Sequence, residues 1–325
     1  IRSEVIKTAI LSLLLGLMTL TGCMVGPNYK QPQTRLPERF ANETGRSFST
    51  NNVETLWWRG FNDEKLNQLI ELAIMGNYDL RIATANLREA RALRSEARFD
   101  LYPTMTSQAS YTRERLSTRV PPVSSDRDIN LYDAGFDATW EIDFFGRVRR
   151  SVEASTAEVR AAEANRQDVV VSILAEVARN YFELRGAQNQ LEVARRNAEN
   201  QKQTLDLTIA LLEGGRGTEL DTSRARAQLN STLATIPPLE TIIKRTIYRL
   251  SVLTGQQPAA LESELSKPLP LPNLPNLVAL GSPKELLRRR SDIRVAEHNL
   301  AAATARIGVA TADLFPRITL IGSIA

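Results

Sequence analysis

Residues 130–145 carry the clearest alternation of apolar and polar positions in the chain. Every second side chain from Tyr132 to Phe144 is apolar, and those between are polar and mostly acidic, as in a β-strand with one apolar face. Seven such positions suit a tilted strand that crosses a bilayer. A half-buried strand of a soluble sandwich shows the same period, so both interpretations stay open. Residues 101–113 are predicted to form the partner strand, after a polar loop that contains Pro121-Pro122.

A helix of unusual length is predicted from Arg147 to about Leu212. Small or apolar residues recur there at spacings of three and four, with Arg, Glu, Gln and Asn between them. Such a helix would be about 100 Å long. It cannot bury its apolar stripe alone, so we expect partner helices in a wall that resembles a coiled coil. A break at Gly186, giving two ordinary helices, is the alternative.

The chain then turns back on itself. Glu213 to Gly217 contains three glycines, and Thr218 with Asp221 resembles a capping box that begins the returning helix. Pro237-Pro238 disturbs this helix, which ends near Gly255. The prediction is a helical hairpin with a small, glycine-rich tip. Five prolines in residues 256–281 indicate a linker rather than a helix.

Two shorter helices precede the strands. Asn62 is predicted as the N-cap of a helix that reaches about Met75, with Asp63 and Glu64 in its first turn. Gly76-Asn77 interrupts this helix, and a second one follows until Pro103. Near the other end of the chain, Ser282-Pro283 is predicted to restart the helical pattern as N-cap and first helical residue.

An internal repeat organises the chain. Residues 77–112 align with residues 290–325 at an offset of 213, without a gap, and 13 of the 36 aligned pairs are identical. Asp-Leu-x-Pro follows the helix in both copies, which favours duplication over a chance likeness of alanine-rich helices. Because the second copy holds only 36 residues, we expect the natural protein to continue beyond them.

The first residues are predicted to be a targeting segment. Arg2 and Lys7 precede an apolar run at residues 9–20, which is too short to span a bilayer as a helix. The run ends in Leu20-Thr21-Gly22-Cys23, which resembles a bacterial lipoprotein processing site with an acylated cysteine. Met24 after it resembles the outer-membrane routing signal. The alternative is an ordinary membrane anchor in which Cys23 is only a small residue. Since no Met begins the sequence, we expect its natural start to lie upstream.

Composition argues against several function classes. The 41 basic and 37 acidic residues give a net charge of +4, which offers no support for nucleic-acid binding. One cysteine and one histidine leave little room for zinc, a disulfide or a Ser/His/Asp triad. No spacing of Ser, Lys and carboxylates resembles a catalytic site, so we predict no enzyme, no catalytic residue, no metal and no cofactor. His298 lies on a predicted helix and is interpreted as structural.

Several motifs together resemble one family. They are Cys23-x-x-Gly26-Pro27-x-Tyr29, Trp140-Glu141-Ile142-Asp143-Phe144-Phe145-Gly146-Arg147, Gly217-Thr218-x-Leu220-Asp221, Ile236-Pro237-x-Leu239-Glu240 and Asp292-Ile293-x-x-Ala296-Glu297. The chain resembles, over nearly its whole length, the TolC-like outer membrane factors of tripartite multidrug efflux pumps, in the OprM-type and NodT branch. The resemblance implies a homotrimer with four strands per protomer in a 12-stranded outer-membrane barrel, and long helices in a periplasmic tunnel. It also implies a periplasmic adaptor (membrane fusion) protein and an inner-membrane efflux transporter as partners, and a passive exit duct for drugs.

The expected fold is therefore mainly α with a transmembrane β portion, in seven segments. These are a lipoprotein signal peptide (1–22), a lipid-anchored segment (23–61), the helices of repeat 1 (62–100), a transmembrane β-hairpin (101–145), the long helical hairpin (146–255), a Pro-rich equatorial linker (256–281) and the start of repeat 2 (282–325). Four strands cannot close a barrel, which needs roughly eight, so closure requires an oligomer.

Three sets of residues are candidate functional sites. Cys23 is the predicted lipid attachment. If the apolar strand face meets lipid, the lumen is lined by the acids Asp133, Asp137, Glu141 and Asp143, which would favour cations. Simple hydration of a pore is the alternative for these acids. The tip residues suit docking of adaptor helices, or serve only to reverse the chain; they are Gly214, Gly215, Gly217, Thr218, Leu220 and Asp221.

One competing function class remains. A periplasmic coiled-coil lipoprotein with a structural or adaptor role would also carry a lipid and long helices. The duplication favours the channel, because it joins strands to helices in both copies, whereas an adaptor more often nests a single helical hairpin between β domains. The predicted location is the outer membrane, with a helical portion in the periplasm.

Overall fold

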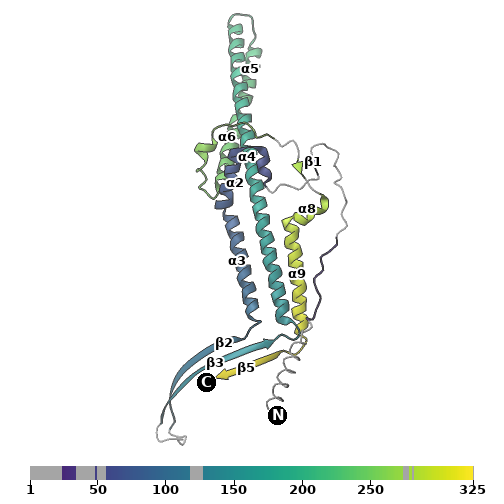
Figure 1. The fold of residues 1–325 in the computed structure, drawn as a ribbon. Coiled ribbons are helices and arrows are strands. Elements are labelled where there is room, and N and C mark those ends of the chain that lie inside the picture. The colour runs from purple at the N-terminus through teal and green to yellow at the C-terminus, as the bar shows by residue number, and fades with distance from the viewer. Residues whose placement is uncertain are drawn as a thin grey trace. The chain divides into compact units, whose positions relative to one another are not determined.

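Figure 1 shows the computed structural model of the protein, which describes residues 24–33, 48–49, 56–117, 127–273, 278–279 and 282–324. The described residues fall into two compact units. The first unit draws on residues within 1–34, 86–164 and 292–325, and the second on residues within 35–85 and 165–291. The helices α3 (Tyr78–Phe99) and α4 (Arg147–Glu213) contribute residues to both.

The first unit contains a three-stranded antiparallel sheet in the order β2-β3-β5 (Figure 1). Its strands are β2 (Thr104–Arg115), β3 (Asp128–Ile142) and β5 (Ile318–Ile324). The predicted strands at 101–113 and 130–145 are confirmed with shifted ends. Strand β2 begins after Pro103, and β3 ends at Ile142 because the next residues prepare the start of α4.

The structure reproduces the internal repeat element by element. Helix α9 spans Ser291–Ala312, and α3 spans Tyr78–Phe99, so both ends differ by the same offset, 291 − 78 = 213 and 312 − 99 = 213. Strand β5 follows α9 as β2 follows α3, and α8 (Pro283–Arg289) corresponds to the end of α2 (Glu64–Gly76). Two copies of one sequence pattern therefore fold in the same way.

Helix α4 runs for 67 residues without a break, so the predicted long helix is confirmed and the alternative of a break at Gly186 is wrong. Within the first unit α4 buries a row of small residues, namely Ala154, Ala157, Ala161 and Ala164, and α9 buries Ala302, Ala305, Gly308 and Ala312. An ion pair between Arg306 and Glu158 joins these two helices. Small side chains allow such helices to approach closely.

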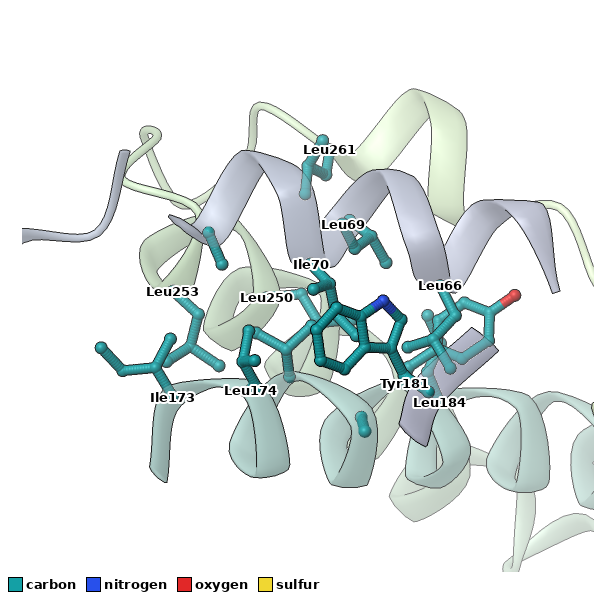
Figure 2. Close-up of a cluster of buried hydrophobic side chains, with 14 of the residues drawn as sticks. Leu66, Leu69, Ile70, Ile173, Leu174, Tyr181, Leu184, Leu250, Leu253 and Leu261 are labelled. Atoms are coloured by element: carbon teal, nitrogen blue, oxygen red, sulfur yellow. The ribbon is translucent and has the colours of Figure 1, made fainter. Parts of the chain in front are cut away.

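The second unit has the apolar core of the chain. Figure 2 shows side chains of α2, α4 and α6 (Ile236–Leu253) packed together, with Leu261 beside them. Leu66, Ile70, Leu184 and Leu250 are fully buried. Asp63, rather than the predicted Asn62, caps α2, because its carboxylate accepts the Leu66 backbone N–H at 2.8 Å. Asn62 instead ends the short 3₁₀ helix η1 (Trp57–Phe61).

The predicted helical hairpin is present, and its returning arm is interrupted next to Pro237-Pro238, as the sequence predicted. The returning arm is split into α5 (Glu219–Leu233) and α6, because Pro237-Pro238 lies in the first turn of α6, where a backbone N–H has no helical partner.

The segment 256–281, predicted to have no helix, contains the short helix α7 (Glu262–Leu265). The predicted cap at Ser282 before α8 is confirmed, with Glu285 completing a capping box. Strands β1 (Phe48–Ser49) and β4 (Val278–Ala279) pair in parallel.

Candidate functional site

The sheet β2-β3-β5 gathers the apolar positions of three strands on one face. Residues opposite each other in an antiparallel sheet point to the same side, so Tyr111 shares a face with Tyr132, and Trp140 with Leu320. The rings of Tyr111 and Tyr132 lie 4.9 Å apart. This apolar face consists of Met105, Ala109 and Tyr111 on β2, Tyr132, Ala134, Phe136, Ala138, Trp140 and Ile142 on β3, and Ile318, Leu320 and Ile324 on β5, with Ser107 and Gly322 between them.

Most of this apolar face is exposed. Met105 is 72% exposed, Tyr132 75% and Ile324 78%, and every residue of β2 and β5 is exposed. Among the described residues, none forms a layer over the central and outer parts of the face. An apolar surface of this kind marks a site of contact with lipid or with another molecule.

The opposite face of the sheet is polar. Asp133 faces Ser110, and Asp137 lies between Thr106 on β2 and Ser323 on β5. This side also has apolar residues, namely Ile321 opposite Thr139, and Ile129 and Leu131 in the first part of β3. The structure thus brings two of the four predicted lumen acids together with hydroxyl groups on the polar face of the sheet.

The other two predicted acids are engaged by α4. Glu141 accepts two hydrogen bonds from Arg147, at 2.8 Å and 2.6 Å, and this pairing raises the pKa of the Arg147 guanidinium. Asp143 lies beyond the end of β3, where its carboxylate accepts the backbone N–H groups of Val148 and Arg149. Sequence reasoning missed both roles. The opposite charges six residues apart around Gly146 were the available signal.

Aromatic side chains collect where the strands meet the helices. Phe145 stacks on Phe315 with ring centroids 4.6 Å apart, and Phe144 lies 6.0 Å from Phe145. The indole N–H of Trp140 donates to the carbonyl of Leu101 at 3.1 Å. Trp140, whose large apolar ring carries one polar N–H, is of the residue type enriched at the boundary between an apolar and an aqueous medium.

The hairpin tip has the geometry that its sequence predicted. Thr218 and Asp221 form the capping box reciprocally, with the Asp221 N–H donating to the Thr218 hydroxyl at 3.2 Å. Gly215 adopts φ +72°, a left-handed conformation that reverses the chain at low cost. Gly214 and Leu220 are exposed, and Leu220 presents 56% of its surface. The tip is therefore a small turn that presents the apolar side chain of Leu220 on its surface.

Other predictions concern chemistry or residues without a described position. Cys23 lies outside the described residues. Within the ranges that the structure describes, no group of three His, Cys, Asp or Glu side chains could hold a metal ion. A membrane-spanning helix is likewise absent from those ranges, since none of their helices combines sufficient length and apolarity. Burial lowers the pKa of His298, with Arg160 and Arg294 adding to the effect and Glu297 and Glu163 opposing it.

Comparisons with known proteins agree with this architecture. Residues 69–256 match the family model described as "Outer membrane efflux protein". The chain is 32% identical over 309 residues to Nodulation protein T of Rhizobium leguminosarum bv. trifolii, covering 94% of this chain and 65% of that protein. It is 31% identical over 316 residues to the solvent efflux pump outer membrane protein SrpC of Pseudomonas putida, covering 95% of this chain and 66% of that protein.

A solved structure extends the likeness to the fold. The outer-membrane channel OprN matches with a TM-score of 0.84 and 44% identity, over 92% of this chain and 66% of that one. The chain thus spans less than two thirds of the length of these relatives. The matched family model covers more than half of the chain, and the fold has the same mainly helical form with few strands. The chain belongs to the outer membrane efflux protein family.

Proposed function

We propose that the protein containing this chain is the outer-membrane channel of a tripartite efflux system, a passive exit duct for drugs and other small molecules. The observation that carries the proposal is the sheet β2-β3-β5, whose apolar face is exposed and whose other face is polar. In water such a face is unfavourable, at about 25 cal/mol per Å² of apolar surface. Lipid on one side and an aqueous lumen on the other satisfy both faces.

The sheet also supports an oligomer. Both outer strands, β2 and β5, have one edge without a strand partner among the described residues. Lipid contains no water to satisfy such backbone groups, so the sheet must close, and closure takes roughly eight strands or more. A homotrimer with four strands from each protomer, as the family resemblance implies, meets this requirement with 12 strands.

The polar face then lines the lumen. We propose that Asp133 and Asp137 make this lining acidic and favour cations in passage. Glu141 and Asp143 stay candidates for the same lining, but their carboxylates already neutralise Arg147 and Arg149. Their contribution to the field in the lumen is therefore smaller.

The helical hairpin supplies the docking end. Its tip residues Gly214, Gly215, Gly217, Thr218, Leu220 and Asp221 are the proposed contact with helices of a periplasmic adaptor protein. Small residues allow a partner backbone to approach, and the exposed Leu220 offers an apolar anchor. The adaptor would connect the duct to an inner-membrane transporter, which supplies the energy.

The lipid anchor completes the proposal. Covalent acylation of Cys23 would hold the protein at the outer membrane, with no other cofactor and no catalytic chemistry in the chain. A periplasmic structural or adaptor lipoprotein is not favoured, because SrpC is an outer-membrane protein of an efflux pump and OprN an outer-membrane channel. Such a role would also leave the apolar sheet face in water.

The test uses the complete protein in a Gram-negative strain that lacks its own outer-membrane efflux channels, with the cognate adaptor and transporter. Restored resistance to toxic small molecules, together with trimers in the outer-membrane fraction, is the expected result. A photo-crosslinker at Leu220 should capture the adaptor, whereas one at the exposed Arg179 on α4 serves as the matched control. Continued sensitivity despite correctly located trimers would refute the duct, and equal capture at both positions would refute tip docking.

A further inference from the structure

A buried arginine holds the segment that follows the predicted lipid site. The side chain of Arg150, in the first turns of α4, is only 1% exposed. Its guanidinium donates to the carbonyl oxygens of Val25 at 3.1 Å and Gly26 at 3.1 Å, and to the Asn28 side chain at 2.8 Å. Glu153 is its carboxylate partner, at 2.7 Å. A buried guanidinium needs such partners, so these contacts fix residues 25–28 in one position.

Two glycines make room for this contact. A Cβ atom at Gly308 of α9 would lie 2.7 Å from the Arg150 side chain, and a Cβ at Gly26 would lie 2.5 Å from the Gly308 Cα. Gly26 also has φ +87°, which L side chains rarely adopt. The segment, the arginine and α9 are therefore stacked at a separation that only glycine permits.

Residues on either side of this arginine contact are also attached to the rest of the first unit. The Val25 backbone N–H donates to the Phe145 carbonyl at 3.1 Å, and Met24 packs against Gly146. The Tyr29 hydroxyl donates to Glu297 of α9 at 3.3 Å. Residues 24–29 thus lie against the junction of β3 and α4 and against α9. We call these residues and Arg150 the N-terminal clasp.

We propose that Arg150 is a positioning residue for the lipid anchor, because the clasp fixes where the acyl chains of Cys23 enter the membrane. Cys23 directly precedes Met24 in the sequence, and Met24 and Val25 contact the strand-to-helix junction that carries Phe144 and Phe145, the second of which stacks on Phe315. Girdles of aromatic residues flank the apolar band of a transmembrane barrel, so the tether and this aromatic cluster would lie at the same depth in the membrane. The lipid role rests on the proposed function, whereas the clasp itself does not.

The physical consequence is a coupling between lipid and protein. A lipid anchor on a flexible tether has little influence on the orientation of the protein, because the linker can adopt many conformations and does not transmit the position of the anchor. When several hydrogen bonds hold the tether in place, the free energy of inserting the lipid into the membrane also stabilises the assembled sheet. An arginine that only stabilises the fold would not depend on the lipid in this way.

The experiment compares four forms of the complete protein in lipid: wild type, Arg150→Met, Cys23→Ser and the double variant. Arg179→Met, at an exposed arginine of α4, is the matched control. Trypsin should cleave after the exposed Lys30 at least about tenfold faster in Arg150→Met than in wild type or control, since local opening becomes easier. Each single variant should also lower the temperature at which trimers dissociate, and the double variant should lower it no further than the more severe single variant.

The outcomes separate the two proposals. Unchanged cleavage at Lys30 in Arg150→Met, or additive losses in the double variant, would overturn the clasp as a positioning device. Absence of radiolabelled palmitate on the wild-type protein would refute both the positioning role of Arg150 and the lipid anchor of the proposed function. Palmitate incorporation is measured independently of cleavage and trimer dissociation. If Arg150→Met does not fold, Gly308→Ala replaces it. The added methyl group displaces the Arg150 side chain, which keeps its charge. Faster cleavage at Lys30, and a non-additive loss when the variant is combined with Cys23→Ser, are again expected.

Discussion

The helical core of the second unit and the sheet of the first satisfy their apolar side chains in different ways. In the core, Leu66, Ile70, Leu184 and Leu250 are buried by neighbours within the same chain (Figure 2). In the sheet, apolar residues such as Met105 and Tyr132 are exposed. Backbone hydrogen bonds form in both regions. The regions therefore differ in what covers their side chains.

The two regions therefore derive their stability from different sources. A helix completes its own hydrogen bonds and needs only a few neighbours along one stripe, so one chain can supply them. A sheet with one apolar face and two open edges needs surroundings that the described residues do not provide. The core is expected to respond to mutation by ordinary packing rules, and the sheet only when its surroundings are present.

The largest effect is expected in the helical core. Leu250→Ala should cost about 3 kcal/mol of unfolding free energy, because it leaves a cavity in a site that is fully buried. Denaturant unfolding followed by the helical circular dichroism signal measures the change. Leu269→Ala, at a half-exposed leucine, is the control and should cost less than about 0.5 kcal/mol. Equal losses would show that this cluster is not the core.

A comparable effect is expected on the sheet, but only in lipid. Phe136→Arg should cost about 2 to 4 kcal/mol in a bilayer, because it moves a charge onto the proposed lipid face. Asp137→Arg, at the neighbouring residue on the opposite face, should leave folding into lipid vesicles nearly unchanged. Measurement of trimer yield in vesicles distinguishes them. Equal tolerance of both substitutions would contradict contact between the apolar face and lipid.

A smaller effect is expected from the hydrogen bond that joins α4 to the N-cap of α2. The Tyr181 hydroxyl donates to the Asp63 carboxylate, whose two oxygens lie at 2.9 Å and 3.0 Å. Tyr181→Phe should therefore cost about 1 to 2 kcal/mol, since the bond to a charged group is lost while the ring stays in place. Denaturant unfolding of the two proteins tests this value. A change below experimental error would show that water replaces the hydroxyl without cost.

The smallest effect is a dependence on pH at His298. Burial, helped by Arg160 and Arg294 and opposed by Glu297 and Glu163, lowers the pKa of this histidine in the folded state. The unfolded chain then takes up the proton first as the pH falls below about 6.5, so stability decreases toward acid. The melting temperature of wild type should drop more between about pH 7.5 and pH 5.5 than that of His298→Gln. Identical drops would remove His298 as a source of the dependence.

Much of the fold could be predicted from the sequence. The alternation before Phe144, the long stripe after Arg147 and the capping box at Thr218 each predicted an element that the structure contains. The cap of α2 was assigned one residue too early, because Asn62 and Asp63 are both good capping residues and only the contacts of the folded chain distinguish them. The helix α7 escaped prediction because five prolines lie in the same segment as its four helical residues.

The candidate site was predictable in part. The two faces of β3 followed from its period alone, and the structure adds the matching faces of β2 and β5. The ion pair of Glu141 with Arg147 and the capping role of Asp143 could not be read from alternation, because they depend on how the strand turns into the helix. The burial of Arg150 was equally invisible in a stretch rich in arginine.

The elements, their order and their duplication follow from the amino-acid sequence alone, because periodicity, caps and glycine turns act over a few residues. The register of the three strands, and the contact between Arg150 and residues 25–28 far earlier in the chain, are visible only in the folded protein. Such contacts depend on which distant segments meet when apolar surface is removed from water. That choice is made by the packing of the whole chain, and no local pattern encodes it.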